Sequence, residues 1–177
     1  GIMRLFQALQ RGEIFGEACQ LIPDECTYAT MMARLNDFDE PEDALALWTE
    51  LLSSPSKKPV TPHVYGAALH SMALTHQWEL ALTTVRSMPA KVPPTRHCFG
   101  AALHACAQAG RPKEALELLN EMASRWGVTP NAHCTNPAIE SIRCFLQASS
   151  PSELEDLLGR PGWEIALELV AALCEAG

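Results

Sequence analysis

Basic side chains are scarce in this sequence of 177 residues. Thirteen Lys and Arg stand against 21 Asp and Glu, for a formal net charge of −8. An acidic protein repels phosphate backbones unless its basic groups gather on one surface. The sequence also lacks any apolar run of about eighteen residues, the length that a membrane-spanning helix requires. These absences disfavour nucleic acid as a partner and exclude an ordinary transmembrane segment.

Closely spaced cysteine pairs are also missing. The seven cysteines are odd in number and form no Cys-x-x-Cys motif, whereas disulfide frameworks and structural zinc sites depend on such spacing. His97-Cys98 and His133-Cys134 recur, but duplication of a repeat explains the recurrence without a metal. We therefore expect no metal, no cofactor, no small-molecule substrate and no catalytic residue, and a reducing compartment suits the free thiols.

What the chain does have is an internal repeat. The segments YGAALHSMA (65–73) and FGAALHACA (99–107) place Gly66 and Gly100 34 residues apart. A period of this length is typical of stacked helical hairpins. One hairpin cannot cover its own apolar face, so neighbouring hairpins complete the core.

A second periodic feature predicts the other helix of each hairpin. Four alanines each open an apolar stripe at the i, i+3, i+4 and i+7 spacing of a helix face: Ala44, Ala81, Ala115 and Ala166. Pro41 and Pro112 fall in the first turn of such helices, where the missing N–H costs nothing. We expect Trp48, Trp78 and Trp163, on or beside these stripes, to lie in the core or to pack between repeats.

These patterns predict an all-α, right-handed α-solenoid of about four helical hairpins in a single domain, 1–177. The expected first helices of the hairpins cover 25–36, 64–76 and 97–109. A Ser152 N-cap is expected to start a helix within an insertion in the last unit. The predicted parts are an N-terminal helical segment at 1–23, units at 24–61, 62–95 and 96–131, and a divergent unit at 132–177 with its insertion near 148–161.

The sequence resembles the pentatricopeptide repeat (PPR) family. PDECTYATMMARLNDFDEPEDALALWTELL (23–52) looks like the opening and helix pair of that repeat, and CFGAALHACAQAGRPKEALELLNEMASRWGVTPN (98–131) resembles it almost end to end. The tetratricopeptide repeat has the same period, but its large aromatic and Gly-Tyr signature is absent from the first helices here. The resemblance implies a helical-repeat protein of mitochondria or chloroplasts.

The resemblance also implies slots that select an RNA base, each combining an early residue of the first helix with the last residue of the repeat. These slots are Ala29 with His63, Gly66 with Thr95, Gly100 with Asn131, and Asn136 in the fourth unit. A base edge is read by side-chain hydrogen bonds, and Ala29, Gly66 and Gly100 have no side-chain group that could make one. Only Asn136 matches the usual chemistry.

Two functions of different classes follow. The first is a non-enzymatic scaffold for protein–protein contacts, a structural subunit of an organellar complex such as a ribosome, respiratory or photosynthetic complex. The alternative is a sequence-specific single-stranded RNA-binding factor of an organelle, acting in RNA processing or translation. An enzyme has no supporting constellation of residues. Trp126, at the exit of a hairpin, is the candidate for a partner contact.

Overall fold

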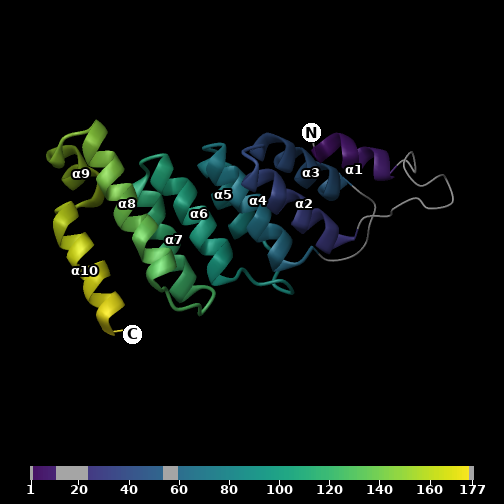
Figure 1. Cartoon of the computed structure of the whole chain (residues 1–177). Helices are drawn as coiled ribbons and strands as arrows, with labels where there is room; N and C mark the ends of the chain where they lie inside the picture. Colours follow the sequence, from purple (N-terminus) through teal and green to yellow (C-terminus); the bar gives the residue numbers. More distant parts are fainter. Residues whose placement is uncertain (1, 11–23, 54–59, 176–177) are drawn as a thin grey trace.

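The computed structural model describes residues 2–10, 24–53 and 60–175. This part of the chain folds into ten α-helices and contains no strand. Figure 1 shows the helices stacked side by side in chain order, with the two termini toward opposite ends of the row. The helices are α1 (Ile2–Gln10), α2 (Glu25–Asp37), α3 (Pro41–Ser53), α4 (Pro62–Leu74), α5 (Trp78–Arg86), α6 (Arg96–Gln108), α7 (Pro112–Ser124), α8 (Ala132–Ala148), α9 (Pro151–Leu158) and α10 (Gly162–Glu175).

The helices form two rows. The first helices of the hairpins, α2, α4, α6 and α8, pack directly on one another in that order, and each also packs on the second helix of its own hairpin. The second helices α3, α5 and α7 lie farther apart, so the first helices form the inner row. The predicted all-α solenoid of hairpins is confirmed.

The exact unit boundaries stay predictions. Helix α1 lies within the predicted N-terminal segment, but residues 11–23 of that segment lie outside the described residues, as do residues 54–59 at the end of the first predicted unit. Helix α9 lies inside the stretch predicted as an insertion.

The same turn closes the first three hairpins. Asp39, His76 and Gly110 each adopt a left-handed backbone conformation, with φ of 60°, 58° and 61°. The residue that follows each of them donates its N–H to the carbonyl five positions earlier, at 2.8, 2.8 and 2.9 Å. This hydrogen bond satisfies a carbonyl that the end of a helix leaves free. The hairpin turn is thus repeated in the backbone, although only Gly110 signals it in the sequence.

Buried thiols join consecutive first helices in a repeated way. The Cys98 Sγ donates to the Pro62 carbonyl of α4 at 3.4 Å, and the Cys134 Sγ donates to the Arg96 carbonyl of α6 at 3.6 Å. Both cysteines are buried, where free Cys packs as a small apolar side chain. Their recurrence is therefore explained by the stacking of the repeats.

Two predictions about local structure are wrong. Helix α9 is capped by Ser150, not Ser152: the Ser150 Oγ accepts from the Glu153 N–H, while the Glu153 side chain accepts from the Ser150 N–H. With Pro151 as the first helical residue, Ser150 has the position that this reciprocal cap requires. Trp163 is not in the core, since 66% of its surface is exposed, whereas Trp48 is buried.

Within the described residues, no helix is both long enough and apolar enough to cross a membrane.

Candidate interaction surface

The inner row carries very small residues at its helix contacts. Ala29, Gly66 and Gly100 are buried. A Cβ added to Gly66 would lie 2.8 Å from the His97 Cδ2, and one added to Gly100 would lie 2.5 Å from the His133 Nε2. Each glycine is therefore covered by an imidazole from the next hairpin. Any larger side chain would have to displace that ring.

The predicted closing residues of the base-selecting slots are not the residues that cover Gly66 and Gly100. Thr95 is the N-cap of α6, and its hydroxyl accepts from the Cys98 N–H at 3.4 Å. Asn131 precedes α8, and its Oδ1 is shielded from solvent without a hydrogen-bond partner. His63, on α4, and Asn136, on α8, are exposed. The base-selecting role of these residues stays a prediction.

Sequence reasoning did not find the contacts that His97 and His133 make. In the sequence, each histidine is followed by a cysteine and lies two positions after a predicted closing residue, Thr95 or Asn131. The structure places His97 against Gly66 and His133 against Gly100. Since both pairs recur at the repeat spacing, their recurrence was the signal that could have revealed these contacts.

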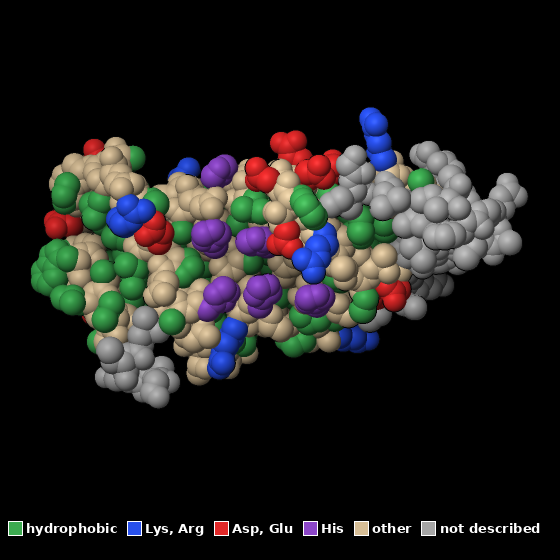
Figure 2. Space-filling model, in the orientation of Figure 1, with side chains coloured by type: hydrophobic (Ala, Val, Ile, Leu, Met, Phe, Trp, Pro, Cys, Tyr) green, Lys and Arg blue, Asp and Glu red, His purple; other side chains and the backbone are tan. Residues whose placement is uncertain are grey.

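Four histidines surround a hollow on the inner row, which we call the histidine hollow. It has a volume of about 270 Å³ and is lined by His70, His97, Gly100, Ala101, His104 and His133. The His97 and His133 rings are parallel to within 2°, with centroids 5.9 Å apart. Histidine side chains gather across the middle of this face in Figure 2.

The histidine hollow favours neutral imidazoles. Burial lowers the pKa of His70, and the nearby His104 and His97 lower it further, while Asp37 acts in the opposite direction. Partial desolvation also lowers the pKa of His97, although much of this residue is exposed, and the nearby His133 and His63 lower it further. Burial and like charge both disfavour the protonated form. The lowered pKa values of His70 and His97 favour their uncharged forms at neutral pH.

Arginines on the inner row are already engaged. Arg34 of α2 pairs with Asp37 at 3.0 Å, and Arg143 of α8 pairs with Glu140 through two nitrogens. Arg96, at the start of α6, donates to the Thr129 hydroxyl at 2.7 Å. Phosphate contacts supply most of the sequence-independent affinity for nucleic acids. The inner row therefore offers few unpaired cations to a phosphate backbone.

Among the described residues, the arrangement of His, Cys, Asp and Glu does not favour metal binding, and the burial of Cys106 does not favour nucleophilic catalysis. Within this part of the chain, no three His, Cys, Asp or Glu side chains are arranged to hold a metal ion. The buried thiol of Cys106 also resists ionisation, because burial raises the pKa of Cys106 to about 12. Since the thiolate is the nucleophilic form, Cys106 is an inert packing residue.

Trp126 offers less surface than its loop position suggests. Its ring is partly buried and packs against the main core, with the Arg125 guanidinium 5.0 Å from the ring centroid. Its indole N–H is shielded from solvent and has no hydrogen-bond partner. A role as a partner contact stays a prediction.

The stacked hairpins define the class: this is a helical-repeat protein. A family profile described as PPR repeat matches residues 97–126, which hold α7 and all of α6 but its first residue. The predicted resemblance to PPR repeats is confirmed over residues 97–126. No curated protein matches it significantly. PPR proteins bind proteins or RNA, are generally non-enzymatic and are typically found in organelles.

Proposed function

We propose that this protein is a non-enzymatic scaffold that holds other proteins in a mitochondrial or chloroplast complex, such as a ribosome, respiratory or photosynthetic complex. The observation that carries the proposal is an apolar face on α10, the last helix among the described residues. Trp163, Leu167 and Val170 are 66%, 60% and 46% exposed. Their spacing of four and three residues places them on one side of the helix.

The equivalent face of α5 is covered. Leu82 and Val85, which correspond to Leu167 and Val170, are 4% and 0% exposed. The next hairpin covers this region: α6 packs on α5, and the Arg111 guanidinium lies 4.8 Å from the centroid of the Trp78 ring. Exposed apolar faces of this kind mark protein–protein contacts.

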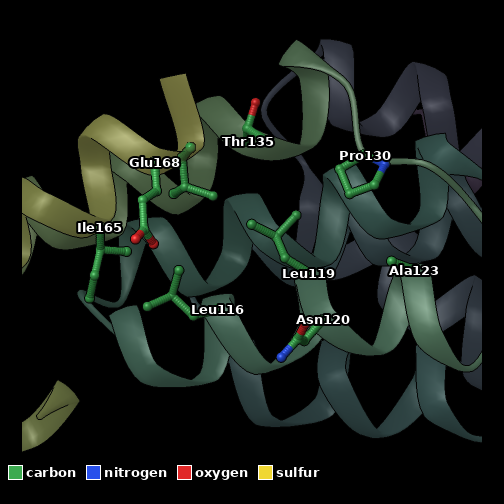
Figure 3. Close-up of a pocket in the computed structure, with 9 residues that line it drawn as sticks. Leu116, Leu119, Asn120, Ala123, Pro130, Thr135, Ile165 and Glu168 are labelled. Carbon is green, nitrogen blue, oxygen red and sulfur yellow. The ribbon is translucent and has the colours of Figure 1, made fainter. Parts of the chain in front are cut away.

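A separate open pocket lies on the other side of α10, where Ile165 and Glu168 face α7. About 320 Å³ in volume, it lies between α7, the loop before α8, and α10 (Figure 3). Leu116 and Leu119 come from α7, while Ile165 and Glu168 come from α10. Arg160 holds the Glu168 carboxylate at 3.0 Å through Nη1. The pocket thus has an apolar floor with a neutralised acidic group at its edge, which suits an apolar side chain of a partner.

RNA binding is the second candidate function. The exposed Asn136 on α8 favours it, since an amide can read a base edge, and so do imidazole rings on which bases could stack. The ion pairs Arg34–Asp37 and Arg143–Glu140 and the net charge of −8 weigh against it.

Purification of the tagged chain from its native cells tests the scaffold. We expect stoichiometric partner proteins, and their loss in the double variant Trp163→Ser, Leu167→Ser. Leu157→Ser on α9, which alters an exposed leucine outside the α10 face, is the matched control and should keep the partners. Equal recovery from all three proteins would contradict a role for α10.

Binding to a randomised single-stranded RNA pool tests the alternative. We expect weak binding at about 50 mM salt and a shallow salt dependence up to about 200 mM. Submicromolar affinity with a steep salt dependence would replace the scaffold by an RNA-binding function.

A further inference from the structure

Resting on the proposed scaffold function, a second inference concerns the histidine hollow. We propose that this hollow is a proton-dependent docking site for an acidic segment of a partner protein, with a partner carboxylate held between the imidazoles. It lies on the inner row and is separate from the α10 face.

The geometry suits a small anionic group. Gly100 and Ala101 provide small side chains at the lining, and His70, His97, His104 and His133 surround them. A volume of about 270 Å³ exceeds that of several waters at about 30 Å³ each, so a carboxylate can enter with part of its hydration. His104 is held in place by Gln108, whose Nε2 donates to the His104 Nε2 at 3.0 Å, so its Nδ1 is the nitrogen left to donate to an anion.

Protonation turns the hollow into a cationic site. A neutral imidazole has one N–H donor, whereas the protonated ring has two and a positive charge. His97 and His133 have parallel rings with centroids only 5.9 Å apart, so charging both is unfavourable unless an anion lies at their N–H edges. A bound carboxylate supplies that anion. Binding and proton uptake are therefore linked.

All the charged groups around the hollow are consistent with this linkage. Helix α2 contributes Asp37, which acts on His70 and is paired with Arg34. Helix α4 contributes His63 and His70, and α6 contributes Arg96, His97 and His104. Helix α8 contributes His133, Glu140 and Arg143. The fixed arginines near the hollow are bound to protein partners. The groups left to change charge near neutral pH are the imidazoles.

The charge pattern favours a peptide carboxylate over a nucleic-acid strand. Asp37 is close enough to influence His70, and His104 to influence Glu140. An extended phosphate backbone that follows the inner row from α2 to α8 would meet both carboxylates. A single acidic side chain can enter the hollow between them. Even with all six histidines protonated, the formal charge of the chain would remain negative, at about −2.

Fluorescence anisotropy with the full chain tests the proposal. The probes are a labelled ten-residue peptide with blocked ends and one aspartate among uncharged residues, and a labelled ten-nucleotide oligouridylate, at about pH 5.8 and about pH 7.8 at constant ionic strength. Aspartate stays ionised at both values. We expect the peptide to bind at least about tenfold more tightly at the lower pH, because two or more imidazoles take up protons, and more tightly than the RNA.

Variants separate the hollow from general surface charge. His97→Gln with His133→Gln should lose at least about tenfold in peptide affinity at the lower pH and most of the pH dependence. His76→Asn is the matched control: His76 is exposed in the α4–α5 turn with φ of 58°, a conformation that asparagine tolerates. Circular dichroism reports whether each variant is folded.

Imidazole titration by NMR in the wild-type chain keeps the test independent of mutation. Adding the peptide should raise the pKa of His70 and His97. Unchanged imidazole titration, peptide binding without pH dependence, or equal binding by the double variant would overturn the proposal. Tighter binding of the RNA would assign the hollow to nucleic acid instead. The scaffold function is tested separately, through the α10 variant. If that variant loses the native partners while the peptide experiments give the contradicting results above, the scaffold function is supported and the role of the histidine hollow is disproved.

Discussion

Helices α5 and α10 have nearly the same sequence pattern but opposite environments. WELALTTV of α5 and WEIALELV of α10 place Trp, Ala, Leu and Val at the same positions. Leu82 of α5 is 4% exposed, while its counterpart Leu167 is 60% exposed. Burial is reversed at Leu80 and its counterpart Ile165, which are 43% and 8% exposed, so α10 packs on its neighbours through a different side from α5.

The cores of the two regions differ accordingly. One continuous cluster of buried residues extends from α1 through the middle of α8. The last part of the row has a separate small cluster of Ile142, Leu154 and Ile165. Because the stability of a solenoid is a sum over neighbouring interfaces, we expect the final helices to open more readily than α4 to α7.

The largest expected effect tests this comparison directly. Leu82→Ala should lower the free energy of unfolding by about 2–3 kcal/mol, because it leaves a cavity at a buried position. Leu167→Ala, the same change at the equivalent exposed position, should cost less than about 0.5 kcal/mol. Urea unfolding of both variants measures the two values. Equal costs would mean that the α10 face is buried in solution, as in a self-associated chain.

A smaller effect is expected from the ion pair that joins consecutive second helices. Arg86 of α5 contacts Glu121 of α7 through two hydrogen bonds, at 2.7 and 3.1 Å, with both side chains about one-third exposed. Arg86→Met should cost about 1 kcal/mol. The matched change Arg34→Met, in a more exposed pair within one helix, should cost less than about 0.5 kcal/mol. A larger loss at Arg34 would contradict the idea that contacts between hairpins carry the stability.

The middle of the row should also be more sensitive to acid than its end. The pKa values of His70 and His97 are lowered in the folded chain, chiefly by burial. The unfolded chain then binds more protons below about pH 6.5, so stability is complete above that pH and decreases as the pH falls through it. Thermal unfolding at about pH 7.5 and 5.5 should show this decrease. It should be smaller in His70→Gln with His97→Gln and unchanged in His76→Asn.

The smallest expected effect concerns the close contact at Gly66. In Gly66→Ala the new Cβ would displace the exposed His97 ring, whose Cδ2 it would approach to 2.8 Å. The gain in helix propensity, about 0.5–1 kcal/mol, offsets the cost of moving the ring. The free energy of unfolding should therefore change by less than about 0.5 kcal/mol, while the NMR signals of His97 shift. A loss of several kcal/mol would show that this imidazole is rigidly held.

Much of the local structure could be predicted from the residues. Apolar stripes at helical spacing and prolines at helix starts predicted the paired helices, because these signals act within one or two turns of chain. The cap of α9 was misplaced by two residues, since Ser150 and Ser152 both precede acidic side chains and only the backbone path selects one.

The sequence by itself determined the period and the helices, since both arise from interactions between residues close along the chain. Only the tertiary structure decided that His97 covers Gly66, that four imidazoles share one hollow, and that Trp163 faces solvent while Trp48 is buried. The physical reason is that a repeat encodes the same side chains whether or not another hairpin is stacked on it. Burial depends on that neighbour.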